Sequence, residues 1–142
     1  MNILIDTNVI LDVLLKRKPF YQDSINILKL AKWENYNLYV SASAFTDIYY
    51  IANKSLKNKT ETKALIKNLT KIVSVASVTE AEIKNALALS WKDFEDSVQY
   101  SVALLQEMDG IVTRNPDDYE EAIIKIWLPE ELLSDLGFSE NS

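Results

Sequence analysis

Short aliphatic and β-branched runs alternate along this chain with amphipathic segments of helical periodicity, and this alternation constrains the fold more than any other feature. We expect strands at 3–5, 38–40, 72–75, 111–113 and 124–127, and helices at 9–15, 21–33, 44–54, 61–69, 80–89 and 94–107. Strands separated by helices of this length form right-handed crossovers, and therefore a parallel sheet covered on both faces. The sequence predicts an α/β protein, a three-layer α/β/α sandwich around a central parallel sheet of four to five strands.

The chain has the size of a single domain with a substantial core. Its 142 residues, 48% of them hydrophobic, predict burial of roughly 68–70% of the surface that the unfolded chain exposes. We assign residues 1–128 to this domain and residues 129–142 to a C-terminal tail that either belongs to it or docks on a partner. The apolar runs are far too short to span a bilayer and no apolar leader precedes the first strand, so we expect a cytoplasmic protein without membrane contact.

The composition restricts the chemistry that a functional site in this chain can use. Histidine and cysteine are absent, whereas aspartate and glutamate together number 21. This excludes Cys/His zinc sites, cysteine nucleophiles and histidine general bases, and any metal site must consist of oxygen ligands. Catalysis in this chain is therefore carboxylate chemistry, and hard cations such as Mg²⁺ or Mn²⁺ are the ions that suit it.

Charge separates two interpretations of the basic residues. The net charge of -6 argues against broad, non-specific attraction to nucleic acid. Local basic positions nevertheless occur at 16–18, at Arg114 and at five lysines between 54 and 67. They form either a local track for a polyanion or solvated helix faces, and the sequence leaves both interpretations open.

Asp6 is the first candidate site residue, because it follows the apolar run Ile3-Leu4-Ile5 directly. Parallel α/β sheets bind ligands outside the carboxyl ends of their strands, so a carboxylate at this position is placed for chemistry. The alternative is structural, since Asp6 or Thr7 would also cap the helix expected after them.

Three further acids fall at an expected strand end or helix start: Asp47, Asp96 and Asp118. A helical wheel places Asp47 in solvent, and Asp118 on its own would be an ordinary turn residue. Asp96, in contrast, begins a helix that is apolar around most of its circumference, where a lone carboxylate costs several kcal/mol unless it is paired or binds a metal. Carboxylates gathered at one sheet edge repel one another, and a divalent cation between them makes the arrangement favourable.

Four segments, in order along the chain, resemble the PIN domain family. They are ILIDTNVIL at 3–11, SASAFTDIYY at 41–50, DFEDSVQ at 93–99 and IVTRNPDDY at 111–119. PIN domains include metal-dependent single-strand ribonucleases, among them the VapC-type toxins of bacterial toxin–antitoxin pairs. The resemblance implies Mg²⁺- or Mn²⁺-dependent hydrolysis of phosphodiester bonds in single-stranded RNA, with an antitoxin protein and a second copy of the chain as partners.

Position by position, the resemblance implies a role for each acid. Asp6 and Asp96 match direct metal ligands, and Asp47, which stands where the family more often has Glu, is a third ligand or acts through a metal-bound water. Asn115 occupies a position that is acidic in many members, so Asp118 is expected to supply that charge and to complete the catalytic set. The groups expected to orient ligands and water are Thr7, Asn8, Asp93, Thr113 and Asn115.

Two alternatives stay open at the level of sequence. A PIN-like fold retained as a catalytically inactive binding module would agree with the acidic charge and with the Asp47 and Asn115 departures. The segment Asp6-Thr7-Asn8-Val9 also faintly resembles the start of haloacid-dehalogenase-like phosphatases. That family usually carries a second aspartate where this chain has Asn8.

Overall fold

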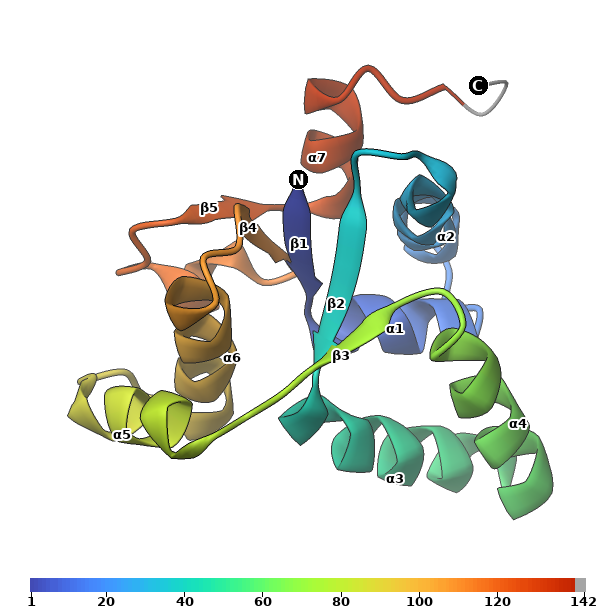
Figure 1. Cartoon of the computed structure of the whole chain (residues 1–142). Helices are drawn as coiled ribbons and strands as arrows, with labels where there is room; N and C mark the ends of the chain where they lie inside the picture. Colours follow the sequence, from blue (N-terminus) through green and yellow to red (C-terminus); the bar gives the residue numbers. More distant parts are fainter. Residues whose placement is uncertain (140–142) are drawn as a thin grey trace.

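The central sheet consists of five parallel strands in the order β3-β2-β1-β4-β5 (Figure 1). The structure is a computed structural model that describes residues 1–139. Its strands are β1 (Asn2–Ile5), β2 (Asn37–Ser41), β3 (Ser74–Ala76), β4 (Gly110–Val112) and β5 (Lys125–Trp127). Each lies where the sequence predicts a strand, with bounds displaced by one or two residues.

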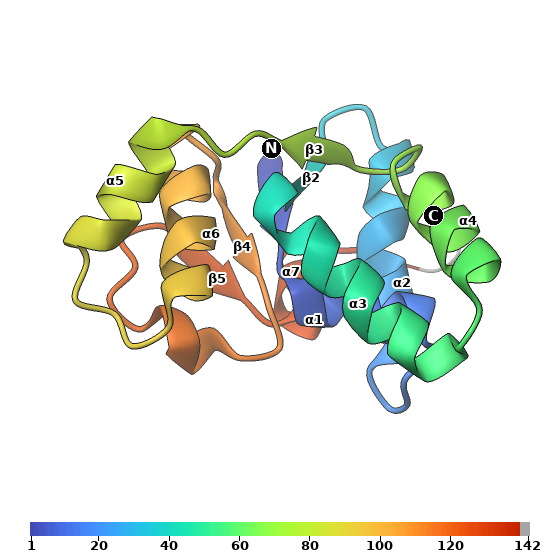
Figure 2. The same cartoon turned by 90° about the horizontal axis from the view of Figure 1, so that it is seen from below.

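Helices cover both faces of this sheet, which confirms the predicted three-layer α/β/α architecture (Figures 1 and 2). One face carries α1 (Thr7–Leu14), α2 (Tyr21–Lys29), α3 (Phe45–Leu56), α4 (Lys59–Leu69) and α7 (Pro129–Asp135). The other face carries α5 (Glu80–Ala88) and α6 (Phe94–Leu105). Short 3-10 turns connect the larger elements: η1 (Leu30–Lys32), η2 (Ala42–Ala44) and η3 (Pro116–Tyr119).

The two faces bury separate hydrophobic cores. Ile3 and Ile5 of β1 point into the core beneath α1, α2 and α3, while Leu4 points into the core beneath α6. All three side chains are fully buried. A strand covered on both sides has no polar face, which explains why β1 appears in the sequence as a continuous apolar run.

Among the element bounds that differ from the sequence prediction, three lie in α1, α2 and β4. The first helix begins at Thr7 because Asp6 caps it. The helix expected at 21–33 ends at Lys29 and continues as the 3-10 turn η1. Strand β4 includes Gly110, where a Cβ atom would lie 2.4 Å from the Lys125 carbonyl oxygen and the Trp127 ring, so the close approach of β5 requires a glycine.

The described part of the expected C-terminal tail lies on the domain. Helix α7 packs against α2 and β5, and buries Leu132 and Leu133 in the larger core. Beyond α7 the Phe138 ring stacks on Trp33, with ring centroids 5.5 Å apart. Residues 140–142 of that tail lie outside the described residues. Within residues 1–139, no helix is long and apolar enough to cross a membrane.

The strand order determines where a ligand site can form. The chain builds β1, β2 and β3 in one direction across the sheet, and then returns through α5 and α6 to place β4 on the other side of β1. Such a reversal opens a crevice at the carboxyl ends of the two central strands, and ligands of open α/β sheets bind there. The residues that follow β1 and β4 are Asp6 and Thr113.

Candidate active site

Asp6 lies at the reversal point and is held there by three donors. Its Oδ1 atom accepts hydrogen bonds from the Thr7 backbone N–H at 2.7 Å and from Gln99 Nε2 at 2.8 Å. Its Oδ2 atom accepts from Thr113 Oγ1 at 2.7 Å. The side chain is only 5% exposed. Asp6 therefore caps α1, as the structural alternative proposed, and at the same time presents a fixed and largely buried carboxylate at the ligand crevice.

Asp96 extends the negative charge from the first turn of α6. The Asp93 carboxylate accepts a hydrogen bond from the Asp96 backbone N–H at 3.0 Å and so begins this helix. Burial, followed by the charges of Asp6, Asp93, Asp118 and Glu95, raises the pKa of Asp96 to about 7. A carboxyl group resists ionisation when neighbouring charges are of its own sign and no cation offsets them.

Asp47 and Glu95 line a cavity near Asp6, and Glu95 is an acid that sequence analysis did not single out. Asp47 is half-buried in the first turn of α3 and lies against Glu95 of α6. A hydrogen bond to Asp47, partial burial and the charges of Asp47, Asp93 and Asp6 raise the pKa of Glu95 to about 6. These two carboxyl groups line a cavity of about 260 Å³, to which Thr7 and Gln99 also contribute.

The remaining predicted acids lie on the other side of Asp96. Asp118, exposed on the short turn η3, lines a second cavity of about 310 Å³ with Asp93, Asp96 and Asp117. Its charge contributes to the raised pKa of Asp96, so the two carboxylates interact electrostatically. Asn115 is exposed, and its backbone N–H donates to Thr113 Oγ1 at 3.0 Å. Through Thr113, this loop therefore supports Asp6.

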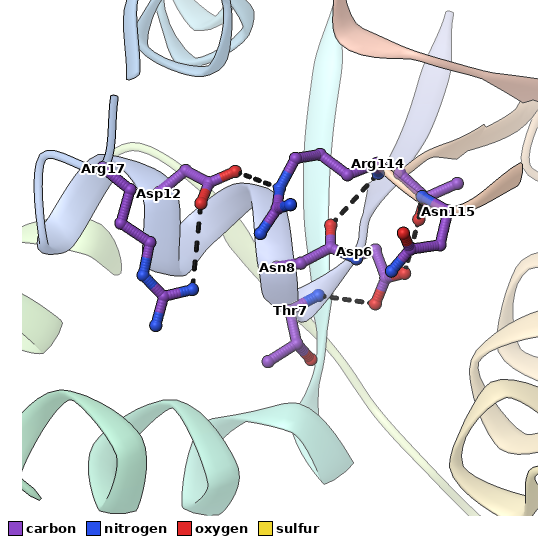
Figure 3. Close-up of polar contacts among 8 residues, drawn as sticks. Asp6, Thr7, Asn8, Asp12, Arg17, Arg114 and Asn115 are labelled. Carbon is purple, nitrogen blue, oxygen red and sulfur yellow. Dashed lines mark hydrogen bonds and ion pairs between the residues drawn. The ribbon is translucent and has the colours of Figure 1, made fainter. Parts of the chain in front are cut away.

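Asn8 and Arg114 fix the loop after β4 to α1. Figure 3 shows Asn8 Oδ1 accepting from the Arg114 backbone N–H, at 3.2 Å. The Arg114 guanidinium turns toward the far end of α1, where its Nε donates to Asp12 Oδ2 at 2.6 Å. It also covers the Phe20 ring, 4.0 Å from the ring centroid. Arg114 is thus engaged in an ion pair, whereas the five lysines between positions 54 and 67, four of them in α3 and α4 and one between these helices, are exposed.

Tyr119 is a second residue that sequence analysis missed. Its side chain is 2% exposed, and its hydroxyl makes no hydrogen bond of standard geometry within the described residues. Burial raises the pKa of this phenol well above its usual value, and the charges of Asp6 and Asp96 raise it further. An uncharged donor therefore lies beside the two central carboxylates.

Gln99 is the third missed residue, and the sequence does hold a signal for it. It is the single amide in the buried stretch of α6 between Val98 and Ala103, three residues after Asp96 and hence on the same helix face. Because a carboxylate accepts only, Gln99 must direct its NH₂ group toward Asp6. Its Oε1 atom is buried and has no hydrogen-bond partner within residues 1–139.

The donor set fits a hard divalent cation held by few protein ligands. Within residues 1–139 no three acidic side chains converge closely enough to enclose an ion. Asp6 and Asp96 remain as oxygen donors, and no lysine or arginine of the described residues forms an ion pair with either. Mg²⁺ is commonly bound by one or two carboxylates, with water and substrate phosphate completing its shell, so this pair suits it.

Comparison with known proteins agrees with the fold. The family model for the PIN domain matches residues 2–117. Ribonuclease VapC1 of Aquifex aeolicus (strain VF5) is 25% identical over 134 residues, which cover 91% of this chain and 91% of the relative. A toxin–antitoxin complex from Klebsiella pneumoniae contains a chain with a TM-score of 0.67 and 18% identity, over 89% of this chain and 96% of that chain.

A third relative shows the same fold at still lower identity. It is VapC20 from Mycobacterium tuberculosis, a toxin that cleaves the sarcin–ricin loop, with a TM-score of 0.67 and 13% identity over 86% of this chain and 96% of that chain. The family match spans β1, the reversal point of the sheet and the loop after β4, and so includes every segment that supplies a central carboxylate. The chain that gathers these acids at the end of its parallel sheet therefore belongs to the PIN domain family.

Proposed function

We propose that this protein is a metal-dependent ribonuclease that hydrolyses phosphodiester bonds of single-stranded RNA and acts as the toxin of a toxin–antitoxin pair. The observation that carries the proposal is the Asp6–Asp96 pair, two neighbouring carboxylates without a cationic partner among the described residues. A PIN domain whose relative in Aquifex aeolicus is named a ribonuclease supplies the reaction class.

In this proposal Asp6 and Asp96 hold the cation, Mg²⁺ or Mn²⁺, and Asp47 acts on it only through water, because no third carboxylate converges with this pair within residues 1–139. When bound, such an ion lowers the pKa of water and stabilises the charge of the transition state in phosphodiester hydrolysis. Asp118 adds negative charge on the opposite side of Asp96, across the second cavity.

The residues around Asp6 act by positioning it. Gln99 and Thr113 each donate to one carboxylate oxygen, so that the carboxylate is fixed in position and in plane. Donors of this kind orient a ligand before the ion arrives, and their loss commonly lowers metal affinity or activity 10- to 100-fold, an order of magnitude typical of such contacts. Asn8 and Asn115 act on Asp6 indirectly, by holding the loop that carries Thr113. Asn8 Oδ1 accepts from the Arg114 backbone N–H, and the Asn115 backbone N–H donates to Thr113 Oγ1.

The partners follow from the relatives and from the charge of the site. Neighbours of this fold occur in toxin–antitoxin complexes, including the one from Klebsiella pneumoniae. We infer an antitoxin as protein partner and a homodimer as the assembly of the toxin. Two observations argue against the phosphatase alternative. The chain belongs to the PIN domain family. An aspartyl-phosphate route also calls for a lysine near the phosphate, and no lysine of the described residues pairs with Asp6.

The test is cleavage of end-labelled single-stranded RNA by the parent protein and by Asp6→Asn, purified in parallel so that contaminating ribonuclease is equal in both. We expect the parent to cleave in Mg²⁺ or Mn²⁺ and to stop in EDTA, and the variant to remain inactive in all three. Equal cleavage by both proteins would contradict the proposal. Retained Mn²⁺ binding by the parent, without cleavage of any RNA offered, would identify a binding module instead.

A further inference from the structure

The cavity beside Asp47 differs in character from a metal site. It is lined on one side by the carboxyl groups of Asp47 and Glu95, and its hydroxyl groups come from Thr7, Ser43 and Thr46. Apolar surface completes it, from Ala44, Ile83, Val98 and Phe94. Its volume of about 260 Å³ is slightly below the range of roughly 300–1,000 Å³ that holds drug-sized ligands, so one planar ring system suits it.

The exposed ring of Phe94 indicates that the cavity binds a ligand. It stands at the start of α6, lines the cavity and leaves 49% of its surface in water. Two other large apolar residues of the region, Ile83 and Val98, are more deeply buried. An exposed aromatic ring at the edge of a small cavity is a surface on which another ring can stack.

The cavity adjoins the proposed catalytic centre through Thr7 and Gln99, which both line it. Gln99 contributes to its lining and donates to Asp6 Oδ1 at 2.8 Å. Thr7 also lines it, and in Figure 3 the Thr7 side chain points away from the Asp6 carboxylate. A group bound in the cavity would therefore contact residues that themselves donate hydrogen bonds to Asp6, the proposed cation ligand.

Charge selects which part of an RNA chain can enter. A phosphate would meet the Asp47 and Glu95 carboxyl groups and be repelled by them. A nucleobase is neutral, and the N–H groups on its edge donate to carboxylate oxygens. Adenine, cytosine and guanine carry an exocyclic amino group for this contact, whereas uracil presents carbonyl oxygens on both sides of its one N–H.

We propose that this cavity binds one nucleobase of the RNA substrate, with Phe94 as its stacking surface and Asp47 and Glu95 as acceptors for its N–H edge. The inference rests on the proposed ribonuclease function, since it assigns a subsite to that substrate. The base belongs to a nucleotide next to the bond that is cleaved, and uracil is the base that the subsite accepts least well.

The test measures binding separately from cleavage. Short labelled single-stranded oligoribonucleotides, each with one abasic position, are titrated with the full chain by fluorescence anisotropy in Ca²⁺, and cleavage is assayed in Mg²⁺. The variants are Phe94→Ala and the aromatic replacement Phe94→Tyr. Leu105→Ala is the matched control, because Leu105 ends the same helix and has a similar exposure of 44%.

If the subsite exists, one abasic position weakens binding by the parent roughly 5- to 150-fold, the range expected for loss of one stacked base. Phe94→Ala should weaken binding of the intact oligonucleotide by a similar factor and show no further loss at that abasic position. Phe94→Tyr and Leu105→Ala should bind like the parent, and uracil at that position should bind more weakly than the other three bases but more tightly than the abasic residue, because it still stacks.

The outcomes separate the two proposals. The subsite proposal is overturned if Phe94→Ala binds the intact oligonucleotide as tightly as the parent does, or if every abasic position weakens binding equally. It is also overturned if the parent binds no oligonucleotide. In these cases the ribonuclease proposal would still hold, provided that RNA cleavage requires Asp6. The abasic pattern without any cleavage would overturn the ribonuclease proposal and keep the subsite. An effect of Phe94→Ala on antitoxin binding alone would assign the cavity to a protein partner and reject the nucleobase.

Discussion

The two ends of helix α1 carry buried carboxylates in opposite electrostatic settings. Asp12, at 0% exposure, lies between two arginines: its Oδ2 atom is 2.6 Å from Arg114 Nε and its Oδ1 atom is 3.8 Å from Arg17 Nη1. Asp6, at 5% exposure, receives only neutral donors. Figure 3 shows both settings, with the Arg114 side chain extending toward Asp12.

The difference distinguishes a structural acid from one that is available for a ligand. At Asp12 the protein supplies its own cations, and the ion pair with Arg114 joins α1 to the loop after β4. At Asp6 it supplies hydrogen bonds that fix the geometry but leave the negative charge without a counter-charge. A buried charge is costly unless it is paired. The Asp6 end therefore favours a cation from solution, and the Asp12 end has no need of one.

Removing Asp12 should have the largest effect on stability. Asp12→Ala leaves two arginines without their carboxylate, and because their side chains are 37% and 24% exposed the cost should be about 1–3 kcal/mol, below the roughly 3–5 kcal/mol of a pair whose remaining charge is fully buried. We expect a loss of this order in the free energy of unfolding, measured by urea denaturation. Asp135→Ala, which removes an exposed carboxylate from α7, is the control and should stay within about 0.5 kcal/mol of the parent. An equally mild effect of Asp12→Ala would mean that the ion pairs contribute little.

Asp6→Asn should produce the reverse result, a loss of activity with the fold intact. Asparagine also caps helices well, and the Gln99 amide can turn over and offer its unpartnered Oε1 atom to the new NH₂ group. We expect the RNA cleavage rate to fall at least about a hundredfold, as when a transition-state contact is removed. Thermal unfolding in EDTA should change little. A large loss of stability in this variant would make Asp6 a structural acid like Asp12.

The pH dependence of stability should report the uncompensated charge at Asp96. Its pKa is about 7 in the folded protein, so between that value and its ordinary value the folded form holds a proton that the unfolded form has lost. Stability in EDTA should therefore rise as the pH falls from 8 to 5, and the raised pKa of Glu95 adds in the same direction. The chain has no histidine, so few other groups titrate in this window.

Asp96→Asn tests this assignment directly. The variant should be more stable than the parent at pH 8 by roughly 1–2 kcal/mol, less than the full shift implies because the carboxyl group is partly exposed and screened by water. It should also lose most of the slope between pH 8 and pH 5. A slope that persists in the variant would place the titration elsewhere.

The sequence was sufficient for the architecture because the strands are buried on both faces. The continuous run Ile3-Leu4-Ile5 reflects two cores at once, and the parallel order of strands brings their carboxyl ends together. The same reasoning predicted that Asp6 and Asp96 lie near one another, and the charge of Asp6 does contribute to the raised pKa of Asp96. The bounds of β3 and η1 were less accessible, since short edge strands and 3-10 turns depend on packing more than on local pattern.

The rest of the site depends on contacts that no local pattern encodes. Gln99 and Asp6 are 93 positions apart in the chain, and nothing near either residue shows that they meet. A helical wheel considers α3 alone and places Asp47 in solvent. The structure half-buries this residue, because α6 brings Glu95 against it. Arg114, for which the sequence left open a basic track or a solvated surface, pairs with Asp12 at the other end of α1.

Addition of a divalent cation tests the difference between Asp6 and Asp12 through the smallest of the expected effects. At a Mg²⁺ or Mn²⁺ concentration several times the dissociation constant, binding to the folded state alone stabilises it by about 1 kcal/mol, a rise in Tm of about 3 °C. We expect this rise in the parent and in Asp135→Ala, at constant ionic strength, and its loss in Asp6→Asn and Asp96→Asn. A rise of equal size in Asp6→Asn would show that the ion binds elsewhere, and that the missing counter-charge at Asp6 has another explanation. Calorimetric titration of the same proteins distinguishes one ion from two, because the stoichiometry counts the ions that the Asp6 end recruits.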